Sequence, residues 1–372
     1  MSEQISQFLQ ERIDAGDFPS AVYLVAEKGE ILMHEALGHA VVEPELIEAR
    51  KDTIYDLASL TKPLMTGLLL ARLIEQQVLG LDDPIGKWAL EFDDRNLQPS
   101  IRDLVCHTSG LPAWVPLYLT SDSPYEVRRA IAELLKESGH QVIYSDLNYI
   151  ILGTIIDRIN GPLWKLAEDF FQESLDCRNT FAMGIPEGLE FQVAASEKGN
   201  EYEKNMCIEM GYLDEATQAT TQSLFRTDVI WGEVHDNNAY FMGGVAGHAG
   251  LFSTAEEVFK IAQQFLPNYT TLLKPETCEL FRTNFTPGKN EHRSFAFQLA
   301  STPESAAGTK MSPESFGHLG FTGTSLWIDP VKERVFILLT NRTHNRKLPF
   351  ENINSVRRRF HDLAIEHLDL IS

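Results

Sequence analysis

The sequence predicts an α/β protein in which one antiparallel sheet is built from both ends of the chain and flanked by terminal helices. Strand-like segments lie in residues 20–37 and 294–341, whereas helical apolar patterns fill the middle of the chain. A chain of 372 residues is long enough for two lobes that share a core. We therefore expect a sheet domain of residues 1–60 and 245–372, an inserted, mainly helical domain of residues 61–244, and an active site in the cleft between them.

The first elements are a helix and a hairpin, followed by the most apolar helix of the chain. Residues 2–14 place their apolar side chains on one helical face. Residues 20–28 and 31–37 flank a Gly-Glu turn and predict two paired strands. Residues 65–74 are almost continuously apolar, and Gly80 suits the end of the helix that they predict.

The middle of the chain reads as a series of helices. Asp103 lies three residues after Ser100, which is close to a capping box and predicts a short helix. Residues 124–137 form an amphipathic pattern, and residues 147–159 carry an apolar side chain at every fourth position. A further helix is expected in residues 162–175.

The last third of the chain returns to strands. Residues 185–240 are polar and irregular, which indicates long loops and small elements. A helix is expected in residues 254–265, followed by a strand in residues 294–300. A hairpin in residues 324–341 and a terminal helix in residues 351–368 complete the predicted fold.

Charge and cysteine content exclude several classes of function. The formal net charge is -21, from 53 acidic and 32 basic residues, so the chain repels phosphate backbones and anionic membranes. The four cysteines form no C-x-x-C pair, which favours buried free thiols over a disulfide framework. No P-loop or G-x-G-x-x-G motif occurs, and we expect no cofactor.

The N-terminus has neither the basic start nor the apolar core of a secretory signal. No stretch of the chain is long and apolar enough to span a bilayer. We therefore expect a cytoplasmic protein, or a periplasmic one if a signal has been removed. The sequence does not indicate an oligomeric state.

Ser59 and Lys62 have the spacing of a nucleophile and its activating base. A serine hydroxyl attacks poorly until a base takes its proton. If Ser59 opens a helix, Lys62 lies one turn further on the same face, where burial can lower the lysine pKa enough to make it a base. The alternative is a helix-capping serine beside a surface lysine. Spacing alone favours that alternative, but the neighbouring motifs favour the catalytic interpretation.

Four other segments occur in an order that resembles the serine β-lactamase and penicillin-binding-protein superfamily, closest to class C β-lactamase-related esterases and D-peptidases. They are a histidine turn, a tyrosine motif, a glycine-rich segment and a strand: His107–Pro112 (HTSGLP), Tyr144–Asp146 (YSD), Gly243–Glu257 and Ser315–Pro330. The resemblance covers nearly the whole chain and implies a β-lactamase/transpeptidase-like fold.

The resemblance implies a mechanism for this chain. Ser59 would attack the acyl carbon, while Lys62 and Tyr144 together manage its proton, and either of the two can be the base. The Lys62 ammonium would lower the pKa of a nearby Tyr144 phenol. The oxyanion hole would consist of the backbone N–H groups of Ser59 and Phe321. Water then releases the acyl-enzyme.

Two departures from the family pattern bear on the substrate. His318-Leu319-Gly320 stands where the family has K-T-G, so the cation and the hydroxyl that hold a substrate carboxylate are replaced. His318 would be cationic only at mildly acidic pH unless its surroundings shift it. Asp146 replaces Asn in the tyrosine motif, and facing Lys62 it would favour the charged lysine. With His248 of the glycine-rich segment, these residues are the expected substrate-binding groups.

The sequence therefore predicts a serine hydrolase, most simply an esterase or a hydrolase of small peptides or D-amino-acid amides. The alternatives are a β-lactamase or D-Ala-D-Ala carboxypeptidase, and a non-catalytic binding protein on the same fold. The expected partner is a small-molecule or peptide substrate, not a nucleic acid. His235, Asp236 and His248 do not have the spacing of converging metal ligands, so we expect no metal. His107 is expected to satisfy backbone groups in its turn.

Overall fold

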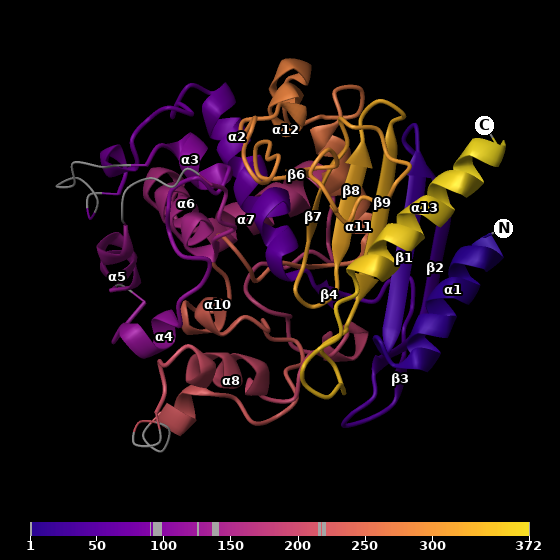
Figure 1. The fold of residues 1–372 in the computed structure, drawn as a ribbon, viewed down its shortest axis with the longest axis horizontal. Coiled ribbons are helices and arrows are strands. Elements are labelled where there is room, and N and C mark those ends of the chain that lie inside the picture. Colours follow the sequence, from indigo (N-terminus) through magenta and orange to yellow (C-terminus); the bar gives the residue numbers. More distant parts are fainter. Residues whose placement is uncertain are drawn as a thin grey trace.

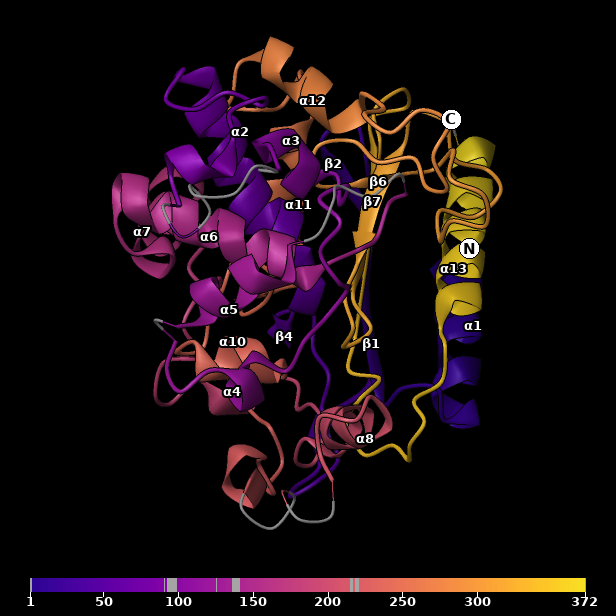
Figure 2. The same ribbon diagram turned by 60° about the vertical axis from the view of Figure 1, so that its left-hand side comes forward.

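The computed structural model consists of three layers: two terminal helices, a sheet, and a thick layer of helices and loops (Figures 1 and 2). It describes residues 2–89, 91, 99–124, 126–135, 141–214, 217 and 221–371. Among these residues no helix is long and apolar enough to cross a membrane. All four cysteines are free and buried, as the sequence predicts.

Within the described residues the sheet has seven strands, in the order β3-β2-β1-β9-β8-β7-β6, and the pairs are antiparallel. The strands are β1 Ser20–Glu27, β2 Glu30–Val41, β3 Ile47–Glu48, β6 Gln298–Leu299, β7 Phe316–Leu319, β8 Ser325–Asp329 and β9 Arg334–Thr340. Strand β1 pairs with β9, so the two ends of the chain form one sheet. The predicted α/β fold class and both predicted hairpins are therefore confirmed.

Alternate side chains of the central strands enter two different cores, as the two-residue period of a strand requires. Tyr23 and Trp327 face the layer formed by α1 (Ser2–Ala15) and α13 (Asn354–Ile371), and Leu24 faces the helices on the other side. Figure 2 shows α1 and α13 lying side by side against one face of the sheet.

The other face of the sheet is covered mainly by helices from the middle of the chain (Figure 1). Their bounds are α2 Leu68–Glu75, α3 Ile101–Val105, α4 Leu117–Thr120, α5 Val127–Leu134, α6 Asp146–Asn160, α7 Leu163–Leu175, α8 Glu201–Glu209, α10 Asn237–Phe241, α11 Ala255–Ala262 and α12 Glu279–Arg282. The predicted capping box is present before α3: Ser100 and Asp103 each accept the other's backbone N–H. A short pair, β4 Tyr55–Asp56 with β5 Phe252–Ser253, joins the nucleophile segment to the glycine-rich segment.

The structure corrects two predicted boundaries. The strand expected in residues 294–300 is reduced to β6, because Ala296 has φ +66° and the chain turns there. This turn lets Phe295 and Phe297 pack into an aromatic cluster of the core. The helix expected in residues 124–137 is shorter, and residues 125, 136 and 137 lie outside the described part of the chain.

Candidate active site

Ser59 lies in a tight turn that several backbone contacts hold in place. It is the middle residue of the 3-10 turn η1 (Ala58–Leu60), which is followed by the π-helical turn η2 (Lys62–Gly67) and then by α2. Ala58 adopts φ +48°, and its N–H donates to the buried Asp56 carboxylate at 2.8 Å. The predicted single helix thus begins with two irregular turns.

The turn between β7 and β8 is bonded directly to the segment that precedes Ser59. The Thr322 hydroxyl donates to the Asp56 carbonyl at 2.8 Å, and the Thr324 hydroxyl donates to the Leu57 carbonyl at 2.9 Å. A Cβ atom on Gly320 would lie 2.6 Å from the Leu57 carbonyl oxygen, so this close approach requires glycine. Consequently Phe321 lines the same cavity as Ser59.

Lys62 is completely buried and surrounded by oxygen atoms. Its Nζ lies 2.9 Å from Ser59 Oγ, 2.7 Å from Asp146 Oδ1 and 3.4 Å from the His248 carbonyl. Burial lowers the pKa of Lys62, but the negative charge of Asp146 and contact with Tyr144 outweigh it, so the pKa lies above its usual value. The expectation of a lysine neutralised by burial is therefore wrong: Asp146 keeps it an ammonium.

Tyr144 lies beside the ammonium, with its ring centroid 4.8 Å from Lys62 Nζ. Burial raises the pKa of the Tyr144 phenol more than Lys62 lowers it, and Asp146 raises it further. The net shift is therefore opposite to the decrease expected from the ammonium alone, because the phenol is fully enclosed. In the resting protein the Tyr144 phenol is neutral and the Lys62 amine is charged.

The HTSGLP stretch fixes the tyrosine motif at the start of α6. The His107 Nδ1 atom accepts the Ser145 N–H at 3.0 Å, and the Ser145 hydroxyl donates to the Pro112 carbonyl at 2.7 Å. Ser109 bonds to Asn148 of α6 at 2.6 Å. As the sequence predicts, His107 satisfies a backbone group, and it holds Tyr144 and Asp146 near Lys62 by doing so.

His318 is buried and neutral, so it supplies no charge in place of the missing lysine. Its Nδ1 lies 2.9 Å from the carbonyl of Leu319 and must carry the proton, because a carbonyl only accepts. Burial, together with the positive charges of Lys62 and Arg293, holds the pKa of His318 well below its usual value. Nε2 is therefore a bare acceptor, and it has no partner among the described residues. His318, Leu319 and Gly320 line the cavity.

The glycine-rich segment places His248 against Asp236. His248 Nε2 lies 2.9 Å from Asp236 Oδ1, and the pair sits next to Asp146. His235, in contrast, contacts Glu197 at 2.8 Å in a separate buried pair. The expectation that these residues do not converge therefore holds for His235 but is wrong for Asp236 and His248. Three donor atoms, one each from Asp146, Asp236 and His248, lie within 4.8 Å of one another, but Asp146 Oδ1 is already paired with Lys62 and Asp236 Oδ1 with His248.

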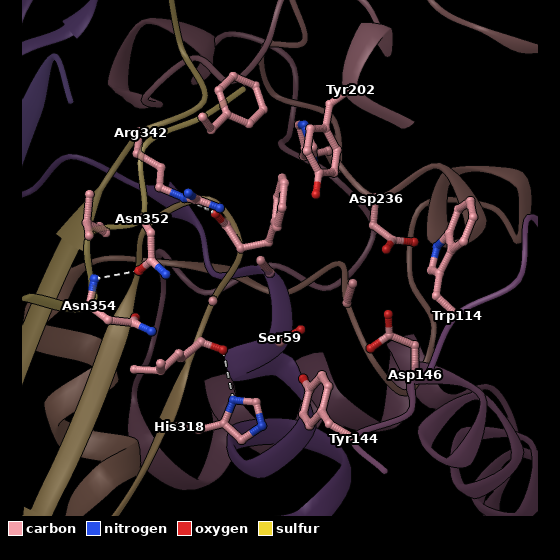
Figure 3. Close-up of a pocket in the computed structure, with 18 of the residues that line it drawn as sticks. Ser59, Trp114, Tyr144, Asp146, Tyr202, Asp236, His318, Arg342, Asn352 and Asn354 are labelled. Carbon is pink, nitrogen blue, oxygen red and sulfur yellow. Dashed lines mark hydrogen bonds between the residues drawn. The ribbon is translucent and has the colours of Figure 1, made fainter. Parts of the chain in front are cut away.

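These groups open into a cavity of about 670 Å³ that also contains residues which the sequence analysis did not identify (Figure 3). The most informative are two arginines, Arg342 and Arg357, and Figure 3 shows Arg342 on the opposite side of Ser59 from Asp146 and Asp236. Arg342 donates to the carbonyls of Phe321 (2.7 Å) and Glu351 (2.6 Å). Among the described residues neither Arg342 nor Arg357 contacts a carboxylate, although both line the cavity.

One of these arginines left a trace in the sequence. Arg357 lies on the apolar face of α13 together with Val356 and Phe360, where a charged residue is unexpected. Its guanidinium donates to the carbonyls of Gly320 and Thr324, and burial together with Arg342 lowers the pKa of Arg357 to about 9. It therefore remains a cation at neutral pH.

Comparison with known proteins gives a consistent result. A family model described as Beta-lactamase matches residues 5–357. The chain is 28% identical over 370 residues to a protein of Escherichia coli (strain K12) named putative D-alanyl-D-alanine carboxypeptidase, covering 92% of this chain and 82% of that protein.

Two solved structures share the fold. EstCE1, a hydrolase with promiscuous acyltransferase activity, superposes with a TM-score of 0.73 at 21% identity, covering 97% of this chain and 98% of that one. A class C beta lactamase from Rhodobacter sphaeroides superposes with a TM-score of 0.69 at 16% identity, covering 98% of this chain and 99% of that one.

Proposed function

The chain belongs to the beta-lactamase family and is a serine hydrolase, and we propose that it cleaves small peptide amides through an acyl-enzyme on Ser59. The observation that carries the proposal is the contact of 2.9 Å between Ser59 Oγ and the buried Lys62 Nζ, at a cavity large enough for a small peptide. The comparisons support the class of enzyme, and the assignment of these residues is our own.

The geometry supports distinct roles for the groups around the hydroxyl. Lys62 is an ammonium and donates to Ser59 Oγ, so it stabilises negative charge on that oxygen as the serine loses its proton. The departing proton enters the group formed by Tyr144, Lys62 and Asp146, where an exchange of protons over short distances can return it to the leaving amine. Because Lys62 is an ammonium and Tyr144 a neutral phenol, either can receive the serine proton only as it passes on one of its own. The Asp146 carboxylate, 2.7 Å from Lys62 Nζ, is the group of this network that can take that proton.

The oxyanion hole proposed here uses backbone groups on both sides of the cavity. Ser59 contributes its own N–H, and Phe321 contributes the N–H that follows Gly320. The bonds from Thr322 and Thr324 to the Ser59 segment support this assignment, because they tie the two backbones to each other. Such preorganised donors lower the barrier without reorganising during the reaction.

The two arginines favour a substrate that carries a carboxylate. Arg342 and Arg357 are cations without a carboxylate partner among the described residues, and an anionic ligand would balance them. In a small peptide the natural anion is the C-terminal carboxylate on the leaving amino acid. The replacement of K-T-G by His318-Leu319-Gly320 therefore does not exclude a substrate carboxylate, because other residues of the cavity supply the positive charge.

The test is a panel of substrates given to the purified full chain. It contains D-alanyl-D-alanine, its C-terminal amide, nitrocefin and p-nitrophenyl acetate, and each is also given to the Ser59→Ala variant. We expect hydrolysis of the ester and the free dipeptide, weaker cleavage of the C-terminal amide, slow or absent hydrolysis of nitrocefin, and no Ser59→Ala turnover. Hydrolysis that persists in Ser59→Ala would reject the proposal. Rapid turnover of nitrocefin alone would replace the peptide substrate with a β-lactam.

A further inference from the structure

Besides the arginines, the cavity has an acidic wall near Ser59. Asp146 and Asp236 both line the cavity, and an oxygen of one lies within 4.8 Å of an oxygen of the other. Glu203, which is 6% exposed, lines the same wall. Figure 3 shows the first two carboxylates on the opposite side of Ser59 from Arg342.

The contacts of these carboxylates leave oxygen atoms available to a ligand. Asp146 Oδ1 is paired with Lys62, and Asp236 Oδ1 accepts from His248 and from the Ala239 N–H. No donor among the described residues bonds to Oδ2 of either aspartate, and their side chains are 17% and 20% exposed. Lys62 and His248 therefore occupy one oxygen of each aspartate, and the second oxygen of each can accept a hydrogen bond from a ligand.

Two further observations point to a ligand that donates hydrogen bonds. His318 Nε2 is a buried acceptor without a described partner, in the wall of the same cavity. Trp114 and Tyr202 also line the cavity, and in Figure 3 their rings flank Asp236. Aromatic faces beside carboxylates are a common environment for an ammonium group.

From this arrangement we infer that the acidic wall of Asp146 and Asp236 binds a free ammonium group on the acyl side of the substrate. The inference rests on the proposed function and specifies its substrate. A peptide whose ammonium contacts the acidic wall and whose carboxylate contacts Arg342 would place its scissile carbonyl between them, where Ser59 lies. In a peptide chain the ammonium belongs to the acyl part and the carboxylate to the leaving part, so the substrate class is a free, zwitterionic dipeptide.

The test compares D-alanyl-D-alanine with N-acetyl-D-alanyl-D-alanine as competitors of p-nitrophenyl acetate hydrolysis by the full chain. Acetylation removes the positive charge and leaves the rest of the dipeptide unchanged. We expect the free dipeptide to have an inhibition constant at least about tenfold lower than the acetylated one, as one charge-assisted hydrogen bond provides. Asp236→Asn should bring the ratio of the two constants to within about twofold.

The ratio is measured within one variant, so a folding defect that lowers the amount of active protein does not change it. Asp169→Asn, an exposed change on α7 outside the cavity, is the matched control and should keep the wild-type ratio. Equal inhibition constants for the two dipeptides in the wild-type chain, or an unchanged ratio in Asp236→Asn, would overturn the ammonium site. Neither result would overturn the proposed function. If p-nitrophenyl acetate does not acylate Ser59, both the ammonium site and the proposed function fail.

Discussion

The two sides of the cavity differ in how their charges are used. On the acidic side, Asp146 is paired with Lys62 and Asp236 with His248, so these carboxylates belong to the network around the nucleophile. On the other side, the guanidinium of Arg342 donates to two carbonyl oxygens, lies over the Phe321 ring and contacts no described carboxylate. The difference indicates that the acidic side affects both catalysis and substrate binding, whereas the arginine side affects the choice of substrate.

The largest expected effect is on the acidic side. Lys62→Met removes the cation that contacts Ser59 Oγ and leaves Asp146 without its counter-ion. We expect kcat/KM for p-nitrophenyl acetate to fall by about 10³-fold or more, with little further loss when Ser59→Ala is added, because groups that act as a unit are not additive. Steady-state kinetics of the two single variants and the double variant check this. Additive losses would show that Ser59 and Lys62 act independently.

Glu203 offers a test of the same wall through stability. Burial, with the nearby charge of Asp236, raises the pKa of Glu203 to about 7. The folded protein therefore holds a proton that the unfolded chain releases near its ordinary pKa of 4.5, and stability falls as pH rises from about 4.5 to 7. The free energy of unfolding of the wild type relative to Glu203→Gln should decrease by about 3 kcal/mol over this range. Denaturant unfolding at several pH values measures it, and parallel profiles would contradict it.

The arginine side should change selection more than catalysis. Arg342→Gln removes a cation of the cavity, so the preference for D-alanyl-D-alanine over its C-terminal amide should fall about tenfold. Arg359→Gln, an exposed change on α13, is the control and should keep the preference. Competition kinetics with the two peptides measure this preference. An unchanged preference in Arg342→Gln would show that Arg342 does not recognise the substrate carboxylate.

The smallest expected effect concerns the pH profile. Asp146 raises the pKa of both Lys62 and Tyr144, so Asp146→Asn lowers both, whichever of them receives the proton. The alkaline rise of kcat/KM should therefore move to lower pH by about one unit, the usual size of a neighbouring-charge effect. A profile measured from pH 6 to 10 with p-nitrophenyl acetate shows this. A shift to higher pH would mean that Asp146 does not act on the base.

Much of the fold could be predicted because its pattern is local. The apolar runs of β1 and β9 and the capping box at Ser100 depend on neighbouring residues alone, and the structure confirms the strands and the cap. The strand expected in residues 294–300 was wrong because Phe295 and Phe297 pack into a core that only the folded chain creates. Local pattern therefore identifies most elements, while tertiary packing decides their ends.

The candidate site was only partly predictable for the same reason. Ser59, Lys62 and Tyr144 come together as the motif order implies, but the sign of the pKa shifts depends on the contact of 2.7 Å between Lys62 and Asp146. Arg342 and Trp114 reach the cavity from loops whose course no periodicity describes. Among the cavity residues that were not predicted, only the arginine on the apolar face of the last helix has a pattern that the sequence shows.

The central claim is that Ser59 carries the acyl group. The most direct measurement is the intact mass of the full chain after reaction with a fluorophosphonate, followed by digestion to locate the added mass. We predict one adduct on the peptide that contains Ser59, and none in Ser59→Ala under the same conditions. An adduct on another residue, or full labelling and turnover of Ser59→Ala, would contradict it.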